Sequence, residues 1–182
     1  MFDLSGRVVV VTGGNGGIGL GLARGVAKAG ADVAIWARDA SKSEAAKAEL
    51  EGHGVRVAAL TCDVADVDAI TRATAETVEQ LGRIDVGFAN AGFGAMANSL
   101  KITPEQWRHV TSVLMDGAFF TFREIAKHMI ERGGGGKLIG IGSIGEIYGM
   151  PRQAAYSGSK SALSGMCRSL AVEWGRHDIQ VN

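Results

Sequence analysis

The sequence predicts an α/β fold, a doubly wound parallel sheet in a single domain that spans residues 1–182. Two observations predict it. Short runs of valine and other β-branched residues alternate with longer segments of helical character, which is the pattern of repeated βαβ units. The short runs are also apolar on both faces, as strands are when helices cover a parallel sheet from each side.

Each element follows from a local stretch of the sequence, and crossovers between parallel strands are expected to be right-handed. The predicted strands cover residues 7–12, 32–37, 55–61, 84–90 and 137–143, and a sixth opens in 178–182. The predicted helices cover residues 17–29, 41–52, 67–81, 105–131 and 156–175. The glycine-rich run 132–137 is expected to be a turn, because Lys137 is followed by leucine where a phosphate-binding P-loop has Ser or Thr.

Composition narrows the class of partner. A chain of 182 residues with 46% hydrophobic content can bury a sizeable core. Its formal net charge is zero and its basic residues are scattered, so neither nucleic acid nor an anionic membrane surface is an expected partner. Small molecules are therefore the expected ligands.

The reactive side chains predict neither a disulfide framework nor a metal site. Cys62 and Cys167 lie far apart without a CxxC motif, and the four histidines show no HxxxH or HExxH spacing. The amino-terminal apolar run is too short for a signal peptide or a membrane span. A reducing, cytoplasmic setting is the expectation.

The turn between the first strand and the first helix carries the strongest motif. Residues 12–19, TGGNGGIG, satisfy GxGxxG from Gly14 and TGxxxGxG from Thr12. Glycines let the backbone approach a pyrophosphate closely, and the following helix offers free N–H groups and the positive end of its dipole. This context predicts a dinucleotide site in a Rossmann-type sheet.

The end of the second predicted strand bears on the choice of dinucleotide. An acidic residue there accepts a hydrogen bond from the ribose of NAD, whereas a basic residue pairs with the 2′-phosphate of NADP. Position 37 is alanine, Arg38 follows it, and Asp39 comes one residue later. NADP is therefore favoured over NAD, and the alternative is that Arg38 and Asp39 form a solvated loop pair.

The last predicted helix combines two polar side chains with an apolar stripe. Its positions recur at spacings of three and four, which places them on one helix face: Tyr156, Lys160, Leu163, Cys167, Leu170 and Trp174. If the apolar part packs on the sheet, Tyr156 and Lys160 point to the same side near the carboxyl ends of the strands.

Taken together, five features resemble the short-chain dehydrogenase/reductase family from end to end of the chain. They are the TGxxxGxG turn, CDV at 62–64, NAG at 90–92, Ser143, and the YxxxK of YSGSK at 156–160. The resemblance implies an NAD(P)-dependent oxidoreductase that interconverts a ketone and a secondary alcohol. It implies catalytic roles for Ser143, Tyr156 and Lys160. The cofactor contacts that it implies are Gly13, Asn15, Gly17, Ile18, Gly19, Arg38, Asp63, Val64, Asn90, Ala91 and Gly92, together with Tyr156 and Lys160.

In that chemistry Tyr156 protonates the forming alkoxide as hydride arrives, and it acts as the base in oxidation. The Lys160 ammonium stabilises the phenolate and can reach the nicotinamide ribose, while Ser143 orients the carbonyl. Asn90 is expected to steady the strand beside the cofactor. The family also assembles through its long helices, and the small residues Gly158, Ala162 and Gly165 favour a homodimer or homotetramer.

Two departures from the family keep a second function class open. Leu114 stands seven residues after Trp107, where the family has an asparagine that relays protons behind the lysine. The chain also ends at Asn182, before the family's Pro-Gly loop and substrate-covering segment, so a truncated or partly observed enzyme is expected. The alternative to an enzyme is a dinucleotide-binding scaffold or sensor with weak or no turnover.

The substrate stays open at this level, since bacterial 3-oxoacyl thioester reductases and polyol dehydrogenases are resembled about equally. Five side chains that follow strand ends either line a substrate pocket or pack in loops: Phe93, Met96, Glu146, Tyr148 and Met150.

Overall fold

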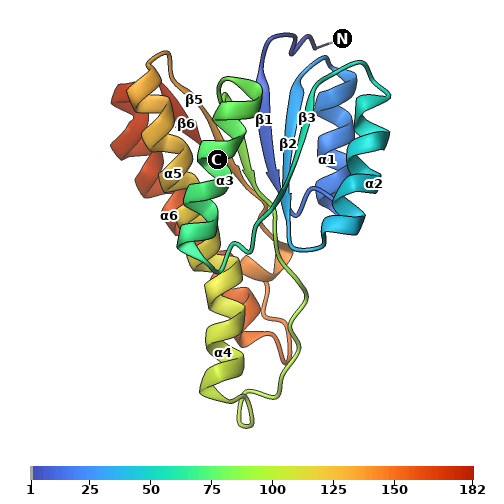
Figure 1. Ribbon diagram of the computed structural model, residues 1–182. Coiled ribbons are helices and arrows are strands. Elements are labelled where there is room, and N and C mark those ends of the chain that lie inside the picture. Colours follow the sequence, from blue (N-terminus) through green and yellow to red (C-terminus); the bar gives the residue numbers. More distant parts are fainter. Residues whose placement is uncertain (1) are drawn as a thin grey trace.

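Six parallel strands form one sheet in the order β3-β2-β1-β4-β5-β6, in a computed structural model that describes residues 2–182 (Figure 1). The strands are β1 Val8–Thr12, β2 Asp32–Ala37, β3 Val57–Thr61, β4 Val86–Ala89, β5 Gly136–Gly140 and β6 Ile179–Val181. The strand order reverses between β1 and β4. In sheets of this kind ligands bind at that reversal, beyond the carboxyl ends of the strands.

Helices connect the strands as the sequence predicts. They are α1 Gly17–Lys28, α2 Ala40–Glu51, α3 Val67–Leu81, α4 Pro104–Thr111, α5 Gly117–Arg132 and α6 Ala154–Trp174. The predicted doubly wound α/β sheet is thus confirmed, with several boundaries displaced by one to three residues. The fifth strand was predicted to reach residue 143 but ends at Gly140, so Ser143 lies in the loop beyond it.

The predicted continuous helix 105–131 is wrong in one respect, because a π-helical segment interrupts it. This segment, η1 Ser112–Asp116, separates α4 from α5 and contains Leu114. Helix α4 starts at a capping box, in which the Thr103 hydroxyl accepts from the Gln106 N–H and the Gln106 side chain accepts from the Thr103 N–H. Single π-helical turns are rare and concentrate at functional sites, and periodicity in a sequence does not reveal them.

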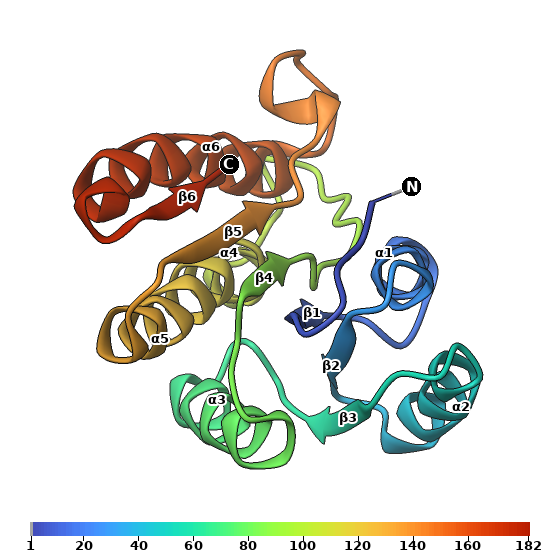
Figure 2. The same ribbon diagram turned by 90° about the horizontal axis from the view of Figure 1, so that it is seen from above.

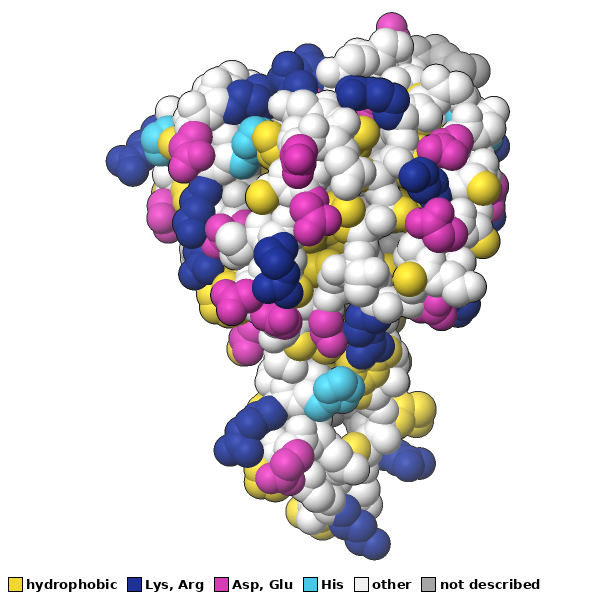
Figure 3. Space-filling model, in the orientation of Figure 1, with side chains coloured by type: hydrophobic (Ala, Val, Ile, Leu, Met, Phe, Trp, Pro, Cys, Tyr) yellow, Lys and Arg dark blue, Asp and Glu magenta, His cyan; other side chains and the backbone are white. Residues whose placement is uncertain are grey.

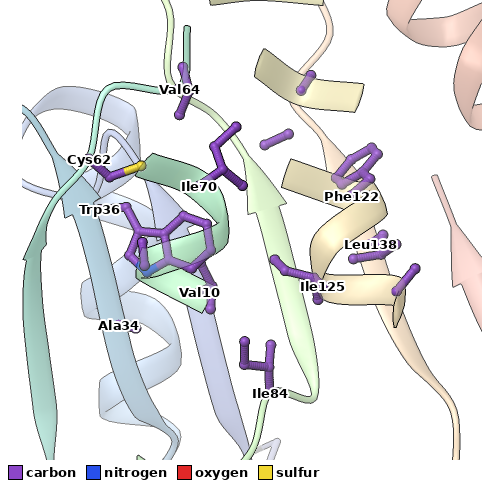
Figure 4. Packing of buried hydrophobic residues seen from close by; sticks show 14 of the residues in the cluster. Val10, Ala34, Trp36, Cys62, Val64, Ile70, Ile84, Phe122, Ile125 and Leu138 are labelled. Carbon is purple, nitrogen blue, oxygen red and sulfur yellow. The ribbon is translucent and has the colours of Figure 1, made fainter. Parts of the chain in front are cut away.

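Alternate residues of each strand feed two apolar layers. Val9 and Val11 of β1 face α1 and α2, while Val8 and Val10 pack with residues of α3, α5 and α6. Figure 2 shows the helices arranged around the twisted sheet. The second layer is centred on Trp36, which is fully buried and donates from Nε1 to the Thr77 hydroxyl at 3.0 Å (Figure 4). Truncation of such a side chain costs about 3–5 kcal/mol, so this layer fixes the sheet on which the site is built.

Helix α4 projects below the carboxyl edge of the sheet (Figure 1). Acidic and basic side chains are interspersed on the face shown in Figure 3, without a patch of one sign. Within residues 2–182, no helix has both the length and the apolar character needed to cross a membrane. The same residues contain no cluster of three or more His, Cys, Asp or Glu side chains arranged to hold a metal ion.

Candidate active site

A groove with two ends runs along the carboxyl edge of the sheet. One end, of about 280 Å³, lies between the tips of β2 and β3. The other, of about 320 Å³, lies between the glycine turn and α6. Gly13, Ala91, Gly92 and Phe93 line both ends, so the groove is continuous. An elongated ligand with two unlike halves fits this shape.

The glycine turn sits where the two ends meet and offers backbone donors. Helix α1 begins after Gly16, and this N-cap glycine has no side chain with which to cap the first N–H groups of the helix. A Cβ atom added at Gly16 or Gly17 would meet nothing within 4 Å, so the space in front of these donors is open. At Gly19, by contrast, a Cβ would lie 2.2 Å from the Gly13 carbonyl oxygen, and only glycine fits. The turn therefore fits the pyrophosphate of a dinucleotide.

Hydrogen bonds between β1 and the NAG segment hold the floor of the groove. The Asn90 side chain donates to the Thr12 carbonyl at 2.8 Å, and the Thr12 hydroxyl accepts from the N–H groups of Asn90 and Ala91 at 2.9 and 3.0 Å. The same hydroxyl donates to the Phe88 carbonyl at 3.1 Å. The Asn90 side chain thus links the end of β4 to β1. This hydrogen bond holds Gly13 next to Ala91, and both residues line the two ends of the groove.

Charged side chains surround the end of the groove beside β2. Arg38 is largely exposed and lies 3.8 Å from the Asp63 carboxylate. The Asp39 carboxylate is engaged as the N-cap of α2, where it accepts from the Lys42 N–H at 3.0 Å. The side chain of Lys42 lines the same end, which the sequence reasoning missed. Lys42 stands in the first turn of α2, which follows the loop of Arg38 directly, and this closeness in the sequence was the available signal.

Apolar residues form another part of the wall at this end of the groove. Val64 lies against Gly117, whose added Cβ would meet the Val64 carbonyl oxygen at 2.8 Å. Cys62 also lines this end, and burial together with the neighbouring charges of Asp63 and Asp66 raises the pKa of its thiol to about 12. It is therefore a protonated, apolar wall.

Asn15 was predicted as a cofactor contact, and its amide is already engaged within the protein. It donates to the Asp39 carbonyl at 3.2 Å and to the Ser43 hydroxyl at 3.1 Å. Asn15 thus braces the glycine turn against the start of α2 while it lines the groove. Ile18, at the first turn of α1, is mostly exposed and lines the other end.

Tyr156 and Lys160 lie on one face of α6 and line the groove end beside Gly92 and Leu114. Lys160 is buried, with 6% of its surface exposed, and its ammonium donates to the Ile141 carbonyl. Burial lowers the pKa of Lys160, and the negative charge of Glu146 partly offsets this effect. The lower part of the face, from Leu163 through Leu170, is buried against the sheet as predicted.

Ser143 stands in the loop after β5 rather than at the strand end. It is the N-cap of the short 3-10 helix η2 Ile144–Glu146, and its hydroxyl accepts from the Gly145 N–H at 3.1 Å. This bond uses one acceptor site of the hydroxyl and leaves its proton available to another group.

Leu114 fills the space behind this end of the groove. It is 2% exposed, and a Cβ added at Gly92 would lie 2.6 Å from its Cδ2. It packs in a small apolar cluster with Val110 and Ala155, against which Tyr156 also rests. A leucine side chain has no exchangeable proton, so any proton relay at this place has to use backbone groups and water.

The five loop residues considered for a substrate pocket separate into different places. Phe93 lines both ends of the groove and stacks on His109, with ring centroids 5.1 Å apart. Met96 lines a separate apolar cavity against α4, of about 230 Å³. Tyr148 is mostly exposed, the Met150 sulfur lies near Gly145, and the Glu146 carboxylate turns toward α6.

A parallel sheet with a glycine turn at its reversal, a long groove and a Tyr–Lys helix face defines the class of nicotinamide-dependent oxidoreductases. The family model described as "short chain dehydrogenase" matches residues 7–182. The chain belongs to the short-chain dehydrogenase/reductase family, whose members act on alcohols and ketones.

Individual relatives place the chain within that family. It is 34% identical to the gluconate 5-dehydrogenase of Gluconobacter oxydans, over all of this chain and 71% of that protein. A dehydrogenase/reductase from Sinorhizobium meliloti superposes with a TM-score of 0.94 at 35% identity, covering 99% of this chain and 71% of that one. An NAD+-bound xylitol dehydrogenase superposes with a TM-score of 0.93 at 30% identity, covering 98% and 68%.

Proposed function

We propose that this domain transfers hydride between NADP(H) and a ketone or secondary alcohol, with Tyr156, Lys160 and Ser143 as its catalytic residues. The observation that carries the proposal is that Tyr156 and the buried Lys160 line the same continuous groove as the glycine turn. Together these features bring a proton donor and a dinucleotide site into one place, as carbonyl reduction requires.

The nicotinamide, when bound, supplies or accepts the hydride. The residues proposed to hold the cofactor are the glycine turn, Arg38 and Lys42 at one end, and Asn90 through Gly92 with Lys160 at the other. In reduction the Tyr156 hydroxyl gives its proton to the alkoxide oxygen, and in oxidation it takes that proton back. The Lys160 ammonium stabilises the phenolate that Tyr156 becomes, and the Ser143 hydroxyl donates to the carbonyl oxygen as charge develops there.

Replacing Tyr156 by phenylalanine tests the role of the phenol. Tyr156→Phe removes the proton donor and keeps the ring, so we expect kcat to fall by at least about 100-fold while cofactor binding is retained. Turnover of NADPH against a panel of ketones and fluorescence titration of the cofactor measure the two quantities. The matched control is Tyr148→Phe, which changes the other tyrosine, 64% exposed on the surface. Retained kcat in Tyr156→Phe excludes Tyr156 as the acid.

The buried Leu114 favours a second candidate, a dinucleotide-binding scaffold or sensor with little turnover. Its side chain has no exchangeable proton, so it cannot relay one at the groove end that Lys160 lines, as a polar residue there could. Cofactor binding without reduction of any ketone in the panel, by a chain extended to the length of its relatives, selects this candidate.

The preference for NADP(H) is proposed from the charges at the β2 end of the groove. Arg38 and Lys42 both line it, next to Asp39, one of whose carboxylate oxygens accepts from the α2 backbone. The exposed ion pair of Arg38 with Asp63 is long, so a 2′-phosphate can displace it at small cost. The NAD+-bound xylitol dehydrogenase is a counterexample among the similar structures.

Affinity measurements with both cofactors test this preference. Arg38→Ala is expected to weaken NADPH about tenfold and to leave NADH nearly unchanged, because the lost contact is to the 2′-phosphate. Arg176→Ala, at an exposed site near the carboxyl end of α6, is the matched control. Equal affinity of the wild type for the two cofactors overturns the preference.

The substrate class and the setting are also proposals. Polyols and sugar acids are the first substrates to assay, since the relatives above include a gluconate 5-dehydrogenase and a xylitol dehydrogenase, and 3-oxoacyl thioesters form the second panel. Two buried free cysteines support a reducing cytoplasm. The open surface around Gly158 supports contact with a second copy through α6, which sedimentation velocity tests.

A further inference from the structure

Glu146 has a fixed position that the mechanism above does not use. Its carboxylate accepts from the Ser164 hydroxyl at 2.5 Å. Its other oxygen lies against Gly142, where an added Cβ would be 2.8 Å from Oε1. Its backbone carbonyl accepts from the Ser161 hydroxyl at 3.2 Å. The carboxylate is therefore held between the loop after β5 and one face of α6.

The two residues that the Glu146 carboxylate contacts, Ser164 and Gly142, are both neighbours of Lys160 or of its hydrogen-bond partner. Ser164 lies one helical turn after Lys160 on α6, so the two side chains share a face. Gly142 directly follows Ile141, whose carbonyl accepts from the Lys160 ammonium. The carboxylate and the ammonium are thus anchored to neighbouring residues of the same loop and to successive turns of the same helix.

We propose, on the basis of the function proposed above, that Glu146 is a positioning residue whose carboxylate keeps the buried Lys160 ammonium charged and directed at the groove. Lys160 is nearly excluded from water, and within residues 2–182 its ammonium donates only to a neutral carbonyl. An ammonium so placed needs a nearby negative charge to remain protonated. The fixed carboxylate of Glu146 supplies that charge, and Lys160 lines the groove together with Tyr156.

The other ionisable groups around this part of α6 do not take over the role. Burial raises the pKa of the Cys167 thiol further along the face, so this thiol carries no charge at neutral pH. Glu124 of the neighbouring helix α5 is bound by Arg123 and Lys127. Asp116 lies in the adjoining π-helical segment, whereas the charge that opposes the effect of burial on the Lys160 pKa is that of Glu146.

The first test measures Lys160 itself, without turnover. NMR of isotope-labelled lysine, with the Lys160 signal assigned from Lys160→Met, gives its titration midpoint in each protein. Glu146→Gln keeps an acceptor for Ser164 and removes the charge, and we expect the midpoint to fall by roughly one pH unit. Glu173→Gln, the same change at an exposed site near the far end of α6, should leave the midpoint unchanged. Equal midpoints in wild type and Glu146→Gln overturn the proposal.

A second variant protects the test against misfolding. Ser164→Ala keeps the carboxylate charge and releases it from its anchor, so the Lys160 midpoint should fall in the same direction by a smaller amount. Thermal unfolding checks that each variant is folded. If Glu146→Gln does not fold, an unchanged midpoint in a folded Ser164→Ala overturns the proposal instead.

The pH profile of alcohol oxidation provides the functional readout. Glu146→Gln leaves Lys160 charged for less of the time, and because the ammonium stabilises the phenolate, the acidic limb of kcat/KM should move to higher pH. A purely structural role would lower kcat at every pH without moving that limb, and such a result also overturns the proposal. If even the wild type shows no turnover, the proposed function fails, and the NMR titration still decides the role of Glu146.

Discussion

A charged side chain is buried at each end of the sheet, and the two side chains differ in how many partners they have. At the amino edge, Asp85 has a side chain 6% exposed and is surrounded by the guanidinium groups of Arg7, Arg83 and Arg132, at 3.3, 2.6 and 3.9 Å. It also accepts from the Val8 N–H at 3.0 Å. At the carboxyl edge, Lys160 is equally buried and donates to a single backbone carbonyl.

The pKa values of these groups follow from their partners. Burial alone would raise the pKa of Asp85, but hydrogen bonds from Val8 and Arg83 outweigh it and hold the pKa below its ordinary value. For Lys160 burial dominates and lowers the pKa. A buried charge with complete partners supports the fold, whereas one with few partners costs stability and is available to a ligand or a neighbouring phenol.

The largest expected effect comes from removing the poorly partnered charge. Lys160→Met should lower kcat by about 100-fold or more and leave the free energy of unfolding at pH 7 unchanged or higher by ~1 kcal/mol. Because the folded pKa lies below the ordinary 10.5, the cost of the charged lysine is present at neutral pH and fades as pH rises toward that value. The stability difference between variant and wild type should therefore shrink in alkaline solution, as urea unfolding at pH 7 and pH 10 would show. If Lys160→Met is much less stable than the wild type at pH 7, the buried lysine charge does not cost stability, and the contrast with Asp85 is wrong.

Removing the well-partnered charge should have the opposite signature. Asp85→Asn leaves three guanidinium groups without their anion and is expected to cost about 3–5 kcal/mol of unfolding free energy while kcat is retained at low temperature. The contribution of Asp85 is present above its ordinary pKa of 3.8 and is lost as pH falls through its lower folded pKa. Urea unfolding from pH 7 to pH 3 measures both effects. Asp178→Asn, an exposed acid near the same edge, serves as the control.

A smaller effect is expected from His128, which lies beside the amino-edge cluster. Its Nε2 accepts from the Ile84 N–H at 3.2 Å, so it is neutral in the fold, and burial and the charge of Arg132 lower its pKa. The unfolded chain takes up this proton below about pH 6.5 and the folded chain resists it, so stability falls as pH drops. His128→Gln keeps an acceptor and should flatten the stability change between pH 7 and 5 by less than about 1 kcal/mol, since the ring is only half-buried. An unaltered slope would remove His128 from the account of the amino edge.

Local pattern was sufficient to predict most of the fold. Alternating β-branched runs and helical periods predicted all six strands and the helices between them, because burial on both faces leaves a clear apolar signature. The π-helical turn around Leu114 was not predicted, since one extra residue in a helical turn barely changes the apolar period. The early end of β5 escaped as well, because the ladder of hydrogen bonds with β4 and β6 decides where a strand stops.

For the site, the sequence alone determined which chemical groups are present and on which helix face or turn they stand, since spacing along a regular element sets direction. It therefore predicted the glycine turn and the shared face of Tyr156 and Lys160. The tertiary structure alone decided what surrounds each group: that Asp39 caps α2, that Lys42 lines the groove with Arg38, and that Glu146 binds Ser164, one helical turn from Lys160. The physical reason is that burial and electrostatic partners come from residues distant in sequence, and these contacts set the charge state of a side chain.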